Sequence, residues 1–89
     1  MVSQKMTVKC IQGLHMRPAG IFAKEMGKFS SNIGIIHNDQ YVNAKSILNI
    51  IAACIKCGDE IVVECSGEDE MQALTKAFEI INTAFDDKE

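Results

Sequence analysis

Apolar residues change their spacing several times along this chain, and the order of these changes restricts the folds that it can adopt. Where they occupy every second position, they indicate strands with one buried face. Such alternation predicts a strand that ends near Cys10 and another over residues 61–65. Residues 32–43 hold two shorter apolar runs around His37-Asn38-Asp39, whose residue types tolerate a tight turn, so a hairpin is predicted there. We expect His37 to be a surface residue of that turn.

The remaining segments have helical spacing. Pro18 is the only proline of the chain, and proline is tolerated in a first helical turn because its missing N–H would have no partner there. The helix that it opens is predicted to bury Ala19, Phe22, Ala23, Met26 and Phe29. Ser46 is predicted to cap a short helix that runs through Cys54. A long C-terminal helix carries one apolar stripe, predicted as Met71, Leu74, Phe78, Ile81 and Phe85. The predicted element order is βαββαβα.

Length and charge limit the functions that fit this order. The chain has 89 residues, which suits one domain over residues 1–89. A net charge of -3 disfavours nucleic acid as the main partner, since phosphate backbones are bound mostly through Lys and Arg. Neither a membrane-spanning apolar run nor a signal-peptide core is present in the sequence. We therefore expect a cytoplasmic protein without membrane insertion.

The segment Gly13-Leu14-His15-Met16-Arg17-Pro18-Ala19 places a histidine just before the helix that Pro18 opens. The first N–H groups of a helix have no partner within it, and its dipole is positive at that end. Both properties favour an anion beside the imidazole of His15. The guanidinium of Arg17 suits phosphate. The segment therefore predicts a place to hold a phosphoryl group on a histidine.

Two motifs resemble those of the HPr family, the histidine-containing phosphocarriers of the bacterial phosphoenolpyruvate:sugar phosphotransferase system, in the form found in Gram-positive bacteria. Residues 13–19 match the family's active-site signature, and Val42-Asn43-Ala44-Lys45-Ser46-Ile47 matches its regulatory serine segment. The resemblance covers essentially the whole chain. It implies an α+β open-faced sandwich, in which a four-stranded antiparallel sheet of order 1-4-2-3 carries three helices on one face.

The same resemblance implies a function. His15 would accept a phosphoryl group on Nδ1 from enzyme I and pass it to IIA domains of sugar permeases, with Arg17 stabilising the phosphate. The chain would then be a monomeric phosphoryl carrier rather than a stand-alone enzyme, and it would need no cofactor or metal. Alternatives within the family are a specialised regulatory paralogue or one of a nitrogen-type branch, although the retained His15 and Arg17 disfavour a purely regulatory form.

Ser46 has both a structural and a regulatory interpretation. Serine is a preferred N-cap residue, which is sufficient to explain it. In Gram-positive relatives the matching serine is phosphorylated by HPr kinase/phosphorylase, and a catabolite control protein is among the partners that contact the first two helices. In the helix and turn that follow this serine, the family is expected to have small residues or glycine. Three residues depart from that pattern, namely Asn49, Ala53 and Cys54.

An apolar docking patch is predicted beside the phosphorylation motif. Its apolar centre comprises Ile21, Ile47, Leu48 and Ile51. Its basic rim comprises Arg17, Lys24, Lys28 and Lys45, and Met16 and Gly20 next to His15 would affect partner choice. An apolar centre with a charged rim suits partners that bind and leave quickly.

The cysteines allow an alternative from a different class of function. Cys54 and Cys57 form a CxxC, and Cys10 and Cys65 lie in strands that the family fold makes neighbours. A redox pair or a four-thiolate zinc site is therefore an alternative. It is disfavoured because the CxxC falls at a helix C-terminus, where the dipole opposes a thiolate.

Overall fold

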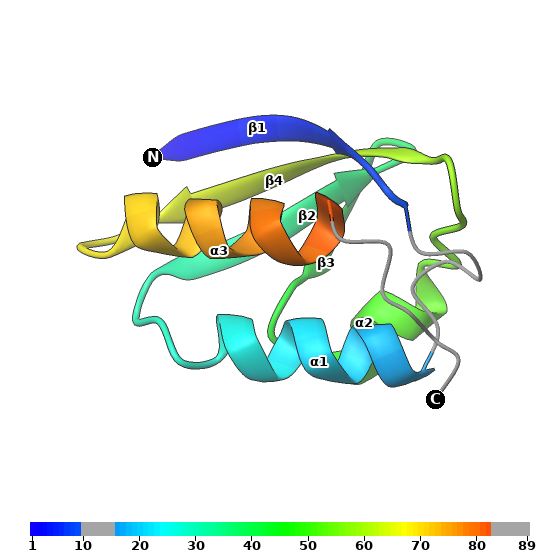
Figure 1. Cartoon of the computed structure of the whole chain (residues 1–89), viewed down its shortest axis with the longest axis horizontal. Helices are drawn as coiled ribbons and strands as arrows, with labels where there is room; N and C mark the ends of the chain where they lie inside the picture. Colours follow the sequence, from blue (N-terminus) through cyan, green and yellow to red (C-terminus); the bar gives the residue numbers. More distant parts are fainter. Residues whose placement is uncertain (10–15, 83–89) are drawn as a thin grey trace.

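The structure is a computed structural model that describes residues 1–9 and 16–82. A four-stranded antiparallel sheet of order β1-β4-β2-β3 is covered on one face by helices (Figure 1). The strands are β1 (Val2–Thr7), β2 (Asn32–His37), β3 (Gln40–Asn43) and β4 (Glu60–Ser66). The helices are α1 (Met16–Met26), α2 (Ile47–Ala52) and α3 (Glu70–Asn82). The predicted order βαββαβα, the strand order and the helix-covered face are confirmed.

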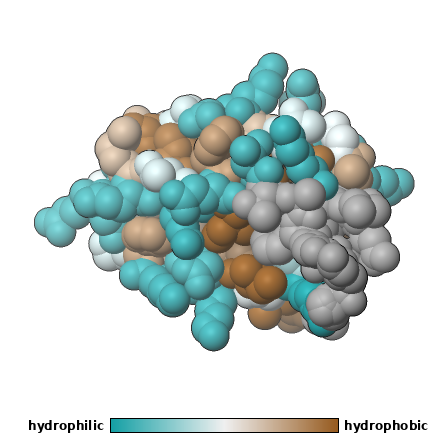
Figure 2. Space-filling view, viewed as in Figure 1, coloured by the Kyte–Doolittle hydropathy of each residue, from teal (hydrophilic) through white to brown (hydrophobic). Residues whose placement is uncertain are grey.

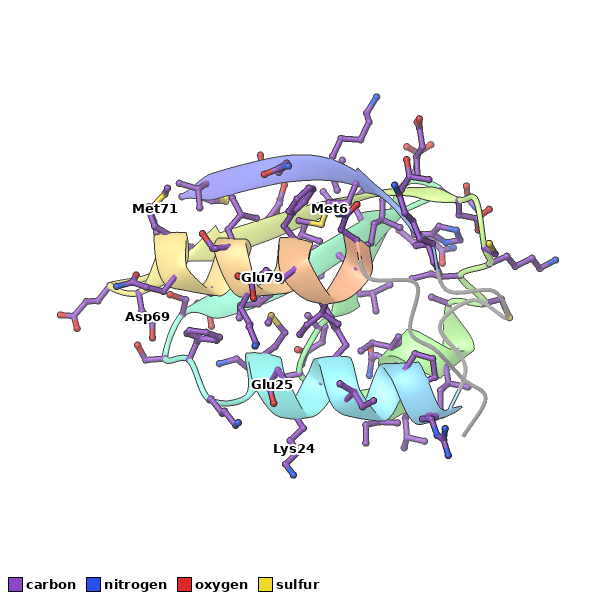
Figure 3. All side chains as sticks on the ribbon, in the orientation of Figure 1. Met6, Lys24, Glu25, Asp69, Met71 and Glu79 are labelled. Atoms are coloured by element: carbon purple, nitrogen blue, oxygen red, sulfur yellow. The ribbon has the colours of Figure 1, made fainter. Side chains whose placement is uncertain are left out.

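Alternating residues of the strands place one face of the sheet against the helices. In β4 the inward residues Ile61, Val63 and Cys65 are buried, whereas Glu60 and Ser66 are exposed. Met6 of β1 points into the space between that strand and α3 (Figure 3). β1 begins at Val2 and ends at Thr7, so the predicted end near Cys10 is wrong. Because β1 pairs with β4 from Val2↔Cys65 to Thr7↔Glu60, the ladder ends where β4 begins.

The hairpin between β2 and β3 has the predicted turn. Asn38 and Asp39 have φ values of 52° and 66°, and two successive left-handed residues are what a two-residue type I′ turn requires. The ring of Tyr41 on β3 covers Gly34 on β2, where an added Cβ would lie 2.2 Å from the ring. Gly34 is therefore the residue that lets the tyrosine lie flat on the open face of the sheet.

α1 buries the predicted face, since Ala19, Phe22, Ala23 and Met26 are at most 6% exposed. Phe29 lies beyond the end of the helix and is only partly buried against the core. The stripe predicted for α3 is partly wrong: its buried residues are Ala73, Leu74, Ala77, Ile80 and Ile81, while Met71 and Phe78 are exposed. Two small alanines, Ala73 and Ala77, let α3 pack closely on the sheet, so the larger Met71 and Phe78 stay outside the contact. Phe85 lies outside the described residues.

Asp69 joins the start of α3 to the segment that leads into β2 (Figure 3). Its Oδ1 accepts hydrogen bonds from the backbone N–H of Ser31 at 3.0 Å and from the Ser31 hydroxyl, and its Oδ2 accepts the backbone N–H of Ser30 at 2.9 Å. The Ser31 hydroxyl, followed by the backbone N–H of Ser30, holds the pKa of Asp69 below its ordinary value. The carboxylate thus provides hydrogen-bond acceptors for two backbone N–H groups that precede β2 and are not paired in the sheet.

Within the described ranges, no helix is long and apolar enough to cross a membrane. The face of the molecule that carries α1 and α3 shows many hydrophilic side chains around smaller apolar patches (Figure 2).

Candidate functional site

The N-terminus of α1 is the centre of the candidate site. The helix begins at Met16, directly after His15, which lies outside the described residues. Arg17 is exposed in the first turn, and that turn contains no acidic side chain. Pro18 is fully buried as the third residue of the helix, where its missing N–H removes no intrahelical hydrogen bond. This end of α1 thus combines the positive end of the helix dipole with the Arg17 guanidinium, which suits a bound anion.

Ser46 forms the N-cap that the sequence predicts for α2. Its backbone is extended, and its hydroxyl oxygen accepts hydrogen bonds from the backbone N–H of Asn49 at 3.3 Å and from Asn49 Nδ2 at 3.0 Å. The side chain of Asn49 thus adds a second donor to the cap, which explains one departure from the expected pattern. The helix ends at Ala52 rather than Cys54, because Cys54 has a φ of 55° and cannot continue it.

The predicted docking patch combines exposed residues of α1 and α2, two helices that pack against each other (Figure 1). Ile21 and Ile47 are about two-fifths exposed, and Leu48 is 78% exposed, whereas Ile51 is half-buried against the core. Gly20 is half-buried, with open space where a Cβ would stand. Met16 is placed as the first residue of the helix.

The residues of the basic rim differ in exposure. Lys24 projects away from the protein (Figure 3), and Arg17 and Lys28 are also exposed. Lys28 Nζ forms an ion pair with Glu25 Oε2 at 3.2 Å. Lys45 is half-buried, because its Nζ donates a hydrogen bond to the Phe29 carbonyl at 2.8 Å and so ties the entrance of α2 to the segment after α1.

His37 is not the surface residue that its turn predicts. It is 6% exposed, and its Nε2 lies 2.9 Å from Asp59 Oδ2. The missed signal is parity along β2: Ile33, Ile35 and His37 occupy alternate positions, so all three face the core. The backbone N–H of Lys56, followed by the His37 side chain, holds the pKa of Asp59 below its ordinary value.

The cysteines of the described residues do not converge. Cys54 and Cys57 are exposed and free in the connection between α2 and β4. Cys65 is buried near the other end of β4, a distance of roughly 20 Å along an extended strand. Burial raises the pKa of its thiol. Cys10 lies outside the described residues, and residues 1–9 and 16–82 contain no group of three side chains able to hold a metal ion.

Comparison with known proteins gives consistent matches over most of the chain. The family model described as the PTS HPr component phosphorylation site matches residues 2–83. The chain is 53% identical over 62 residues to phosphocarrier protein HPr of Mycoplasma capricolum, covering 70% of each sequence. It is 38% identical to the HPr-like protein Crh of Bacillus subtilis, over 85% of this chain and 89% of that one. The crystal structure of HPr-C-His from Thermoanaerobacter tengcongensis superposes with a TM-score of 0.92 at 33% identity, covering 96% of each chain.

Proposed function

The chain belongs to the HPr family of the phosphotransferase system, and on this premise we propose that it carries a phosphoryl group on His15, taken from phosphorylated enzyme I and passed to IIA domains of sugar permeases. One observation carries the proposal most directly. α1 begins immediately after His15, with Arg17 exposed in its first turn, and the residues of that turn include no acidic one. A single-domain, cytoplasmic, monomeric carrier without metal or cofactor fits this role.

The chemistry needs few groups. Nδ1 of neutral His15 attacks the phosphorus held by enzyme I, so that a P–N bond forms while the bond to the donor breaks. In the next transfer the P–N bond breaks as the IIA acceptor attacks, and the imidazole leaves as a good leaving group once protonated. Positioning and electrostatics dominate phosphoryl transfer. Arg17 and the N-terminus of α1 would supply the positive charge for both steps.

The surroundings of His37, the second histidine, support His15 as the carrier residue. The chain has two histidines. The His37 ring is buried, and its Nε2 is engaged with Asp59 at 2.9 Å. Access for two successive partners is required of a carrier residue, and a buried ring does not offer it. His37 therefore provides a matched control within the same chain.

Labelling with enzyme I and radioactive phosphoenolpyruvate tests the proposal. The wild type should take up one acid-labile phosphate, His15→Ala should be folded and unlabelled, and His37→Gln should still be labelled. Arg17→Ala should slow transfer with little change in thermal stability, since its side chain is exposed. Arg17→Lys should recover only part of the rate, because an ammonium lacks the guanidinium fork. Label that persists in His15→Ala would overturn the assignment.

We also propose Ser46 as a regulatory phosphorylation site for HPr kinase/phosphorylase, with a catabolite control protein as reader of the product. The Ser46 side chain is half-buried at the start of α2, beside the exposed Ile47 and Leu48. Its oxygen acts as acceptor in both bonds with Asn49, so the hydroxyl proton is not committed to that partner. A phosphate there would meet the positive end of α2 and place a dianion beside the docking patch.

The kinase and ATP should modify the wild type and leave Ser46→Ala unmodified. The product should keep its fold, and phosphorylation of its His15 by enzyme I should slow. Ser46→Asp should slow it in part through charge alone. If the kinase labels a standard HPr but not this chain, Ser46 is a helix cap only.

Similarity to the HPr-like protein Crh favours one alternative, a specialised paralogue of the same fold. The enzyme I assay separates the two functions. A folded wild type that stays unlabelled, in a reaction that labels a standard HPr, would favour the paralogue over the general carrier.

A further inference from the structure

We propose that Asn49 restrains the phosphorylation of Ser46, because its side-chain amide occupies a position on the Ser46 hydroxyl oxygen that the incoming phosphorus needs. Asn49 is then a specificity-determining residue for this modification as well as a part of the helix cap. The inference rests on the proposed regulation of Ser46, and it gives a consequence to a residue at which this chain departs from the pattern expected for the family.

The Ser46 hydroxyl oxygen accepts two hydrogen bonds from a single residue. The backbone N–H of Asn49 donates to it at 3.3 Å, and Asn49 Nδ2 donates to it at 3.0 Å. N–H···O hydrogen bonds in proteins are usually about 2.7–3.2 Å long, so the side-chain bond has an ordinary length and the backbone bond is a long one. The Asn49 side chain therefore supplies the stronger of the two contacts.

These two bonds use both lone pairs of the hydroxyl oxygen. Besides its bond to Cβ, a serine oxygen has one proton and two lone pairs. In the modification an Oγ–P bond forms from one of these lone pairs, while the bond between the γ-phosphorus of ATP and the oxygen of ADP breaks. The hydroxyl proton passes to a base of the kinase. One of the two hydrogen bonds from Asn49 must therefore break before the phosphorus can bond to Ser46.

The side-chain bond is the one that can break without disturbing α2. The Asn49 N–H belongs to the backbone of the helix, in which the Ala53 N–H donates to the Asn49 carbonyl at 3.2 Å. The backbone of Ser46 is held on both sides, since its N–H donates to the Asn43 carbonyl and its carbonyl accepts the Ile50 N–H, each at 3.1 Å. Asn49 itself is exposed, so its side chain can rotate into solvent, where water accepts from the amide.

Two substitutions at position 49 separate the hydrogen bond from the bulk of the side chain. Asn49→Leu keeps a branched side chain of similar size and removes the donor, whereas Asn49→Ala removes both. Each variant retains the backbone N–H that bonds to Ser46. Ala52→Gly is the matched control, because it weakens α2 at its exposed last residue and leaves both bonds to Ser46 in place. It tests whether a less stable helix is by itself enough to expose the serine.

The first readout is the exchange of the Asn49 side-chain amide protons with water, followed by NMR. Their exchange should accelerate by about two- to tenfold in Ser46→Ala, as expected when the amide loses one neutral hydrogen bond. The exposed Asn32 of β2 is the internal control, and the exchange of its side-chain amide should stay unchanged. An Asn49 amide that exchanges equally fast in both proteins would contradict the contact.

The second readout is phosphorylation of Ser46 by the kinase and ATP, measured as kcat/KM at a temperature where every variant is folded. Asn49→Leu and Asn49→Ala should both raise kcat/KM by about two- to tenfold, because one neutral hydrogen bond no longer has to break. Ala52→Gly should keep the wild-type value. Phosphorylation of His15 by enzyme I should be unchanged in all three variants, since none of them alters the docking patch.

Each other outcome overturns a different part of the inference. Wild-type kcat/KM in both variants at position 49 would refute the restraint. Equal acceleration in Ala52→Gly would also refute it, because opening of α2 would then limit the reaction. Acceleration in Asn49→Ala alone would assign the effect to side-chain bulk and not to the hydrogen bond. If the kinase labels a standard HPr but neither the wild type nor any variant, the proposed regulation of Ser46 is wrong, and the restraint falls with it.

Discussion

Cys54 is held in a conformation that its side chain disfavours. Its φ of 55° lies in the left-handed region, just after the C-cap of α2, where glycine is the usual residue. The side chain is exposed, so its removal deletes little buried surface. Replacement by glycine should therefore stabilise the protein, even though glycine ordinarily weakens a fold.

The size of the gain depends on two opposing effects. The left-handed conformation costs a residue with a Cβ about 1–2 kcal/mol. Against this, glycine lowers the free energy of unfolding by about 0.5–1 kcal/mol relative to alanine, because its unfolded chain has more conformational freedom to lose on folding. The net stabilisation of Cys54→Gly over Cys54→Ala should be about 0.5–1 kcal/mol, which for 89 residues is about 3–5 °C in Tm.

Urea and thermal unfolding under reducing conditions measure this difference. Comparing glycine with alanine at position 54 removes the thiol from both variants, so only the backbone effect remains. Cys57 is the matched control, because it is also exposed but has no positive φ. Cys57→Gly should be less stable than Cys57→Ala. If alanine is as stable as glycine at position 54, the strain argument is wrong.

Three further changes have defined outcomes. Ser46→Ala should cost about 1 kcal/mol in urea unfolding through loss of the cap, whereas Ser46→Asp should cost much less, because aspartate also caps helices. Gly34→Ala should push the Tyr41 ring off the sheet, because the added Cβ would clash with it. Tyr41 is the only tyrosine of the sequence and tryptophan is absent, so the near-UV circular dichroism of tyrosine should weaken. An unchanged tyrosine band would argue against the contact. The pKa of Asp69 lies below its ordinary 3.8 in the folded protein, so its stabilisation is present above that pH and is lost as the pH falls through the folded value. Acid titration of Asp69→Asn should accordingly show a weaker loss of stability below about pH 4 than the wild type.

Most of the element order was predictable because it depends on local properties. Spacing of apolar residues, the single proline and the Asn38-Asp39 turn each act over a few residues, and each predicted element is present. Element ends were less predictable. β1 ends opposite Glu60, the first residue of its partner β4, and α2 ends where Cys54 adopts a left-handed conformation. Neither cause is visible in the periodicity of the segment itself.

The buried face of α3 is less predictable from the sequence, because side-chain size does not indicate burial there. Ala73 and Ala77 are fully buried, while Met71 and Phe78 are exposed. A helix that packs closely on a sheet needs small residues at the contact, and which stripe becomes the contact depends on where the sheet lies. The direction of the helix relative to the strands is a tertiary property.

The sequence by itself determined the family, the strand and helix order, the helix that opens beside His15 and the cap at Ser46. These depend on motifs and on contacts within a few positions of the chain. Only the tertiary structure decided which polar groups are buried and what they bind. His37 meets Asp59 across 22 positions, and Ser31 meets Asp69 across 38. Such partners are chosen by the pairing of strands and the docking of helices, because a buried donor must find its acceptor wherever the fold brings one within reach.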